Sequence, residues 1–150
     1  MRFLIALAGF ALLGHGLARA DSGAFKPGLG EIMSLQQARH IKLWLAGTHR
    51  NWALAAYELE EIQEGFDDAK SMHPTFESVP VAALVGQLTP GPLEAIGKAI
   101  KAKDLPGFRK SFASLTAACN TCHRAANHGF IAITQPRAPA FGNQQFEPSR

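Results

Sequence analysis

An apolar seam over residues 104–127 constrains the fold of this chain more than any other feature. Its members recur at alternating steps of three and four residues: Leu105, Phe108, Phe112, Leu115, Cys119, Cys122 and Ala126. That alternation places the whole set on one face of an α-helix. Asp104 is a candidate N-cap, and Asn127 or Gly129 is suited to ending the helix. The seam therefore predicts an amphipathic helix that buries one face against partners.

Residues 51–73 repeat this spacing with a second seam: Trp52, Ala55, Leu59, Ile62, Phe66, Ala69 and His73. The acidic side chains of the same segment occupy its other faces and are interpreted as solvated surface: Glu58, Glu60, Glu61, Glu64, Asp67 and Asp68. Two shorter helical patterns complete the set, and no convincing strand pattern occurs. Four amphipathic helices, at about residues 32–46, 50–73, 90–103 and 104–127, predict an all-α four-helix bundle.

The last predicted helix contains the pentapeptide Cys119-Asn120-Thr121-Cys122-His123. Cys-x-x-Cys-His is the spacing at which a chain attaches a c-type haem through two thioethers, with the histidine as the proximal iron ligand. On a helix, Cys119, Cys122 and His123 lie within an arc of about 100°, so all three can face one side of a flat macrocycle. The sequence therefore predicts one covalent haem c on the C-terminal helix.

These two cysteines are the only ones in the chain. A thioredoxin-like Cys-x-x-Cys normally lies in a βαβ unit, which the surrounding pattern lacks. A structural zinc ion needs four ligands, two of which would have to come from scattered histidines. A disulfide between Cys119 and Cys122 leaves the adjacent His123 without a role. Disulfide formation and zinc binding stay open as the alternatives to haem.

Residues 74–88 are expected to link the second and third helices. Residues 128–150, rich in Pro, Gly and Gln, are predicted to form a long non-helical C-terminal tail. The tail is too apolar to float free, since it contains Phe130, Ile131, Ile133, Phe141 and Phe146. We therefore expect it to wrap back over the bundle or over an edge of the haem.

Residues 1–20 have the three parts of a secretory signal peptide. Arg2 is the basic start, residues 3–13 are an apolar run, and Ala18-Arg19-Ala20 is an Ala-x-Ala cleavage site. The run is shorter than the about 20 apolar residues of a membrane-spanning helix. We therefore expect a periplasmic protein with one haem-binding domain over residues 21–150 and no membrane span.

The charge balance gives little sign of a nucleic-acid partner. Of the 15 Lys and Arg residues, two lie in the predicted signal peptide, so 13 stand against 12 Asp and Glu in the mature chain. No basic patch is interleaved with aromatic residues. The high isoelectric point therefore does not indicate binding to nucleic acid or to a membrane surface.

With its export signal, its helical pattern and Cys119-x-x-Cys122-His123 near the C-terminus, the chain resembles the class II cytochromes c, the cytochrome c-prime and c-556 group. The resemblance covers about residues 31–127. It implies a bundle with one haem, redox partner proteins and a homodimer through a helix face. The chain departs from this group in its long tail and in Arg124-Ala125-Ala126-Asn127, where the group usually has an aromatic-basic pair.

The residue on the distal side of the iron decides the chemistry, because six-coordinate iron favours electron transfer whereas an open position favours ligand binding. Met33 and His40 are the candidate distal residues. Met33 matches the region from which c-556 proteins supply a methionine, although such a methionine is often core filler. His40 lies mid-helix on the same element, where a structural role is the ordinary alternative. His73 and His128 are weaker candidates.

The leading hypothesis is a soluble electron carrier that passes one electron at a time between redox partners and needs no catalytic residue. One alternative is a five-coordinate haem module that binds nitric oxide or carbon monoxide. Another is a peroxidase-like haem enzyme in which His40 is the distal acid-base group. The identity of the distal residue separates these hypotheses.

Overall fold

The structure is a computed structural model that describes residues 25–137 and 141–148. It contains five helices: α1 (Leu29–Thr48), α2 (Trp52–Met72), α3 (Val81–Leu88), α4 (Pro90–Ala102) and α5 (Leu105–Ala125). Within the described residues, β-structure is limited to one isolated bridge between Phe76 and Val79. The prediction of an all-α helical bundle is therefore confirmed. The predicted signal peptide, residues 1–20, lies outside the described residues.

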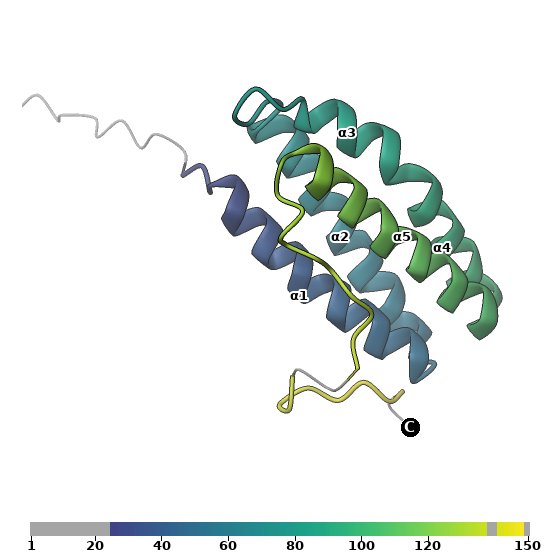
Figure 1. The fold of residues 1–150 in the computed structure, drawn as a ribbon. Helices are drawn as coiled ribbons and strands as arrows, with labels where there is room; N and C mark the ends of the chain where they lie inside the picture. Colours follow the sequence, from purple (N-terminus) through teal and green to yellow (C-terminus); the bar gives the residue numbers. More distant parts are fainter. Residues whose placement is uncertain (1–24, 138–140, 149–150) are drawn as a thin grey trace, which may run out of the picture.

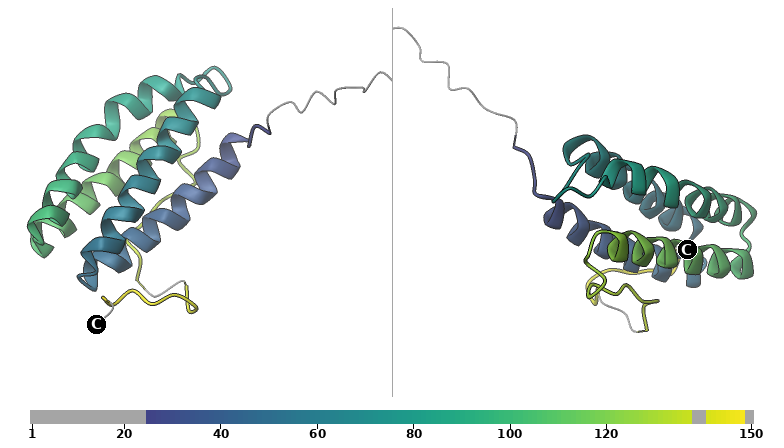
Figure 2. Two further views of the ribbon diagram at one scale, coloured as in Figure 1. Left: turned by 180° about the vertical axis from the view of Figure 1, so that it is seen from behind. Right: turned by 45° about the horizontal axis from the view of Figure 1, so that its top comes forward.

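Consecutive helices of the bundle run in opposite directions, except that α3 and α4 run in the same direction and together form one arm of the bundle (Figure 1). α1 packs mainly on α2, and α4 packs mainly on α5, while α3 and α4 follow one another along a single arm. Figure 2 shows the same arrangement from behind, with α1 and α2 side by side. Because α5 runs opposite to α1, its C-terminal end lies beside the start of α1. The Cys-x-x-Cys-His motif is therefore at that end of the bundle.

The prediction that residues 74–88 form only a linker is wrong in its second half, which is α3. Val81 and Val85 are one helical turn apart and both are buried. Pro80 precedes the first turn, where the missing N–H of a proline removes no intrahelical hydrogen bond. Thr89 then ends α3 and precedes α4, and its hydroxyl donates to the carbonyl oxygen of Val85 at 2.9 Å. The two helices thus form one arm without an intervening loop.

α1 is longer than the predicted residues 32–46. It begins near Gly28, whose backbone N–H donates to Oε2 of Glu31 at 2.8 Å. It also continues through Gly47 to Thr48, and at position 47 only glycine fits, because the ring of Phe108 occupies the space where a β-carbon would lie. The remaining predicted bounds, 50–73, 90–103 and 104–127, lie within two residues of the observed ones, a difference that is common at helix ends.

The core is centred on aromatic side chains where α1 meets α5. The ring of Trp44 lies 4.9 Å from that of Phe112 and 6.3 Å from that of Phe108, centroid to centroid. Side chains from both predicted seams, from α4 and from the tail complete the cluster, including Ala55, Leu59, Ile62, Leu93, Ile96, Leu115 and Phe146. Burial is thus confirmed for the central part of each seam, whereas the ends of both seams, including Cys119 and Cys122, are only partly buried. No helix among the described residues is long and apolar enough to cross a membrane.

The interpretation of the acidic side chains of α2 as solvated surface is wrong for Glu58. Its side chain is on the side of α2 that meets α1, and the residue is only 2% exposed. Burial raises the pKa of this carboxyl, and Lys42 acts in the opposite direction, with its Nζ 4.0 Å from Oε1. The charge of Lys42 offsets part of the desolvation of Glu58, which explains how an acidic residue is tolerated between two helices.

Replacing Gly47 with alanine is expected to destabilise the protein by about 1–3 kcal/mol, because the added methyl group would overlap the ring of Phe108. The matched control is Gly86→Ala in α3, where nothing lies within 4 Å of an added β-carbon. There the higher helix propensity of alanine should add about 0.5–1 kcal/mol of stability. The midpoints of urea unfolding should therefore move in opposite directions. A midpoint for Gly47→Ala at or above that of the unsubstituted protein would contradict this packing.

Candidate functional site

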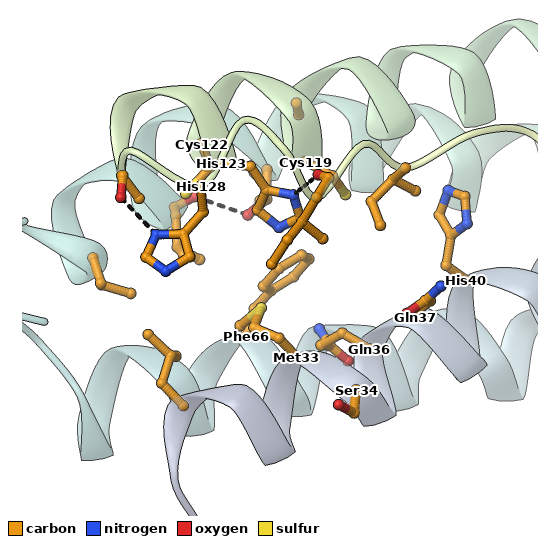
Figure 3. Close-up of a pocket in the computed structure, with 18 of the residues that line it drawn as sticks. Met33, Ser34, Gln36, Gln37, His40, Phe66, Cys119, Cys122, His123 and His128 are labelled. Atoms are coloured by element: carbon orange, nitrogen blue, oxygen red, sulfur yellow. Dashed lines mark hydrogen bonds between the residues drawn. The ribbon is translucent and has the colours of Figure 1, made fainter.

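The end of α5 and the first half of α1 border a cavity of about 300 Å³. Cys119, Cys122 and His123 line it from α5, and Met33 lies across from them on α1 (Figure 3). His40 lines the cavity farther along α1. Most other lining side chains are apolar, including Leu29, Ile62, Phe66, Val81, Val85, Leu115, Ile131 and Ile133. The fold thus brings the motif and both distal candidates to one apolar cavity, whose volume is at the lower end of the range for small-molecule pockets.

The two cysteines are free thiols in the structure. Burial raises the pKa of the Cys119 thiol to about 11, with a smaller contribution from Cys122, and burial also raises the pKa of Cys122. Both residues lie in the last two turns of α5, where the negative end of the helix dipole disfavours a thiolate. A reactive redox Cys-x-x-Cys has the opposite setting, with a lowered thiol pKa at a helix N-terminus. These thiols are therefore protonated groups that face the cavity.

The imidazole of His123 donates from Nδ1 to the backbone carbonyl oxygen of Ile131 at 2.7 Å. A carbonyl oxygen can only accept, so this hydrogen bond places the proton on Nδ1 and leaves a lone pair on Nε2. A histidine that ligates a metal commonly has this arrangement, with one ring nitrogen held by a hydrogen bond and the other directed at the metal. In the neutral ring of His123, Nε2 is thus the nitrogen that can accept a further partner.

The carbonyl that holds His123 belongs to the segment after α5, which folds back along the helix. Asn120 donates from Nδ2 to the carbonyl oxygen of Ile133 at 2.8 Å and accepts from the backbone N–H of Ile133 at 2.7 Å. Sequence analysis missed both Asn120 and the carbonyl of Ile131. The motif leaves the residue type at position 120 unspecified, and no sequence signal marks which backbone carbonyl a folded tail will present.

The opposite directions of α1 and α5 place Met33 level with His123. A hydrogen bond between His40 and Thr116 sets the register of the two helices. Met33 is seven residues before His40, and His123 is seven residues after Thr116. Both steps run toward the same end of the bundle and cover about 10.5 Å at about 1.5 Å per residue. Met33 therefore faces His123 across the cavity, as Figure 3 shows, whereas His40 lies about two turns farther along.

His40 is 4% exposed, and its ring packs on Phe112 with the centroids 4.3 Å apart. The hydroxyl of Thr116 donates to the carbonyl oxygen of Phe112 at 3.0 Å. Nε2 of His40 must therefore donate to Oγ1 of Thr116, at 2.9 Å. Burial lowers the pKa of His40 from 6.5 to about 4, so the ring is neutral at pH 7. These contacts join α1 to α5 through a neutral imidazole.

The two weaker histidine candidates are also held by backbone carbonyls. Nε2 of His73 lies 2.8 Å from the carbonyl oxygen of Pro27, which ties the end of α2 to the segment before α1. His128, the first residue of the tail, lines the cavity, and its Nδ1 lies 2.6 Å from the carbonyl oxygen of Ala126. His128 is thus near the site but on the α5 side of it, together with His123.

No protein-family model matches the chain, and neither a curated protein nor a solved structure matches it. The function is therefore inferred from the chemistry of the motif and of the cavity that contains it.

The lowered pKa of His40 predicts a loss of stability in mild acid. Between pH 6.5 and about 4, the unfolded chain binds a proton at His40 that the folded chain does not bind. The free energy of unfolding therefore falls as the pH falls through this window, by about 3 kcal/mol when complete. His40→Gln retains a donor for Thr116 but does not titrate, so its unfolding free energy should depend less steeply on pH. Equal slopes for the two proteins, measured by urea unfolding between pH 7 and 4.5, would contradict a buried neutral His40.

Proposed function

We propose that this chain is an exported mono-haem c-type cytochrome that carries single electrons between redox partner proteins in the periplasm. The observation that carries the proposal is the convergence of Cys119, Cys122 and His123 on one apolar cavity. The hydrogen bond from Nδ1 of His123 to Ile131 supports it further, since Nε2 is thereby left for a metal. Export and periplasmic location are supported by the signal-like residues 1–20.

The residues of the cavity suit a haem group. Two thiols less than one helical turn apart can reach the two vinyl groups of one porphyrin, and the adjacent imidazole can reach its iron. Apolar side chains from α2 and α3, such as Phe66 and Val85, suit the faces of a macrocycle. A structural zinc ion needs four ligands, and among the described residues no group of three or more His, Cys, Asp or Glu side chains is placed to hold a metal ion.

The haem, when bound, supplies an iron that changes between the ferric and ferrous states and so accepts and releases one electron. The chain contributes the rest of the function. Cys119 and Cys122 anchor the porphyrin, and His123 supplies the proximal nitrogen. The apolar side chains of the cavity exclude water and thereby help to set the reduction potential. This function requires no general acid, base or nucleophile.

Met33 favours an electron carrier over a gas-binding module or a peroxidase. Its sulfur is on the opposite side of the cavity from His123 (Figure 3), and a thioether that fills the distal position favours electron transfer. His40 could serve as an acid-base group only close to the iron. It instead donates to Thr116, about two helical turns from the level of His123.

Exposed apolar side chains beside the cavity suit the docking of a redox partner. Phe130 is 81% exposed and Ile131 is 43% exposed, and both belong to the segment that contacts His123. Interfaces between electron-transfer proteins are small and weak. A few such side chains around a haem edge are sufficient for a transient contact.

The protein, expressed with its signal peptide in a host that matures c-type cytochromes, should have the mass of residues 21–150 plus one haem. Replacing both Cys119 and Cys122 with serine should abolish covalent haem, because the chain has no other cysteine. The matched control is Thr121→Ser, which changes an exposed residue between the two cysteines and should leave the haem attached. Intact-protein mass spectrometry measures all three. A bare polypeptide mass for the unsubstituted protein would overturn the proposal.

The distal ligand can be identified by optical spectra of the oxidised and reduced protein with and without carbon monoxide. The unsubstituted protein should be low-spin, and Met33→Ala should become high-spin and take up carbon monoxide. Met72→Ala is the matched control, because Met72 is on α2 and outside the set of residues that line the cavity. His40→Ala should keep the low-spin spectrum. An unsubstituted protein that is already high-spin and binds carbon monoxide would favour the gas-binding function instead.

A further inference from the structure

We infer that Asn120 is a positioning residue of the haem site, which pins the returning tail so that the carbonyl of Ile131 holds the imidazole of His123 in its ligating orientation. This inference rests on the proposed function and adds a residue to it. In the structure, Asn120 contacts the tail and not the ring of His123, so its effect on the iron must pass through Ile131. We call Asn120, residues 131–133 and the ring of His123 the proximal clamp.

The side chain of Asn120 binds the tail through two hydrogen bonds, of which it donates one and accepts the other. Its Nδ2 donates to the carbonyl oxygen of Ile133 at 2.8 Å, and its Oδ1 accepts from the N–H of the same residue at 2.7 Å. An amide side chain can satisfy both groups of one backbone residue in this way, whereas a hydroxyl or a carboxylate of similar size cannot donate and accept with the same geometry. The pairing therefore fixes both the position and the rotation of the backbone at Ile133.

The segment before Ile133 is held from the other side as well. The N–H of His128 donates to the carbonyl oxygen of His123 at 2.7 Å, and the N–H of Ile131 donates to that of His128 at 2.9 Å. The carbonyl of Ile131 thus lies between a turn that continues from α5 and the residue pinned by Asn120. Without Asn120, the restraints on this carbonyl would be the turn before it and, thirteen residues beyond Ile133, the buried side chain of Phe146, so the backbone around Ile131 could move away from α5.

The carbonyl of Ile131 affects the electronic properties of His123 as well as its orientation. Its hydrogen bond to Nδ1 fixes the rotation of the ring and increases the electron density at Nε2. A more basic Nε2 stabilises the ferric state over the ferrous state and so lowers the reduction potential. A weakened hydrogen bond should therefore raise the potential. Outer-shell partners of this kind typically change metal binding or activity by about 10–100-fold when they are removed.

Thr121 provides a matched control for Asn120, because it is the other unspecified residue of the motif. Its hydroxyl donates to the carbonyl oxygen of Ala117 at 2.9 Å and accepts from Arg124 at 3.1 Å. These contacts all lie within α5 and on its exposed side. Alanine at position 121 should thus change the helix surface between the cysteines while the proximal clamp stays intact.

The experiment compares Asn120→Ala and Thr121→Ala with the unsubstituted holoprotein, each produced with its haem attached. Intact mass checks the haem, a redox titration measures the potential, and hydrogen exchange of the Ile133 amide measures the clamp directly. Asn120→Ala should retain one haem, exchange the Ile133 amide faster, and shift the ferric–ferrous equilibrium about tenfold toward ferrous, which is about 59 mV for one electron. Thr121→Ala should match the unsubstituted protein in all three measurements.

The outcomes separate this inference from the function on which it rests. A haem-loaded Asn120→Ala with the potential of Thr121→Ala would overturn the positioning role and leave the cytochrome function standing. Faster exchange at Ile133 without a change in potential would also overturn it, since the tail would then be held for stability alone. An unsubstituted protein of bare polypeptide mass would overturn both.

Discussion

The packing of α1 on α5 is the contact on which the geometry of the candidate site depends. Trp44 of α1 packs against Phe108 and Phe112 of α5, and these rings fill the centre of the bundle. The contact lies away from the Cys-x-x-Cys-His motif, yet it determines what the motif faces. A slip of one helical turn, about 5.4 Å, would move Met33 away from the level of His123. The core therefore selects the residue that lies across the cavity.

Apolar packing alone would specify this register weakly, because burial of apolar surface is not directional. The hydrogen bond between His40 and Thr116 is directional, and a slip would leave a buried polar group without its partner. A lowered pKa agrees with this role, since a neutral imidazole needs no counter-charge in the core. His40 thus contributes to the site by fixing the register of α1 and α5, and it lies two helical turns from the position that a distal ligand would occupy.

The parts of the fold that follow from helical periodicity could be predicted from the sequence. The seam of α5 placed Cys119 and Cys122 on the inward face because their spacing continues the apolar pattern of the helix. Periodicity could not reveal α3, whose eight residues between Pro80 and Thr89 are too few to establish a pattern. It also could not show that Gly47 is in close contact with another helix or that Glu58 is buried. Both depend on side chains of another helix, namely Phe108 and Lys42.

In the tail, too, the sequence pattern predicts burial but not the contacts that determine the geometry of the site. Its apolar content predicts that it packs on the bundle or the haem, and Phe146 is buried in the core cluster at the far end of the bundle. Such an anchor offsets the entropy lost when the tail is ordered, but it specifies no geometry near the motif. Geometry there comes from Asn120, whose two hydrogen bonds to Ile133 are directional. The burial of Phe146 tolerates small shifts of the tail, whereas the hydrogen bonds between Asn120 and Ile133 do not. The two together allow a segment without helical structure to hold the carbonyl of Ile131 at a fixed point beside His123.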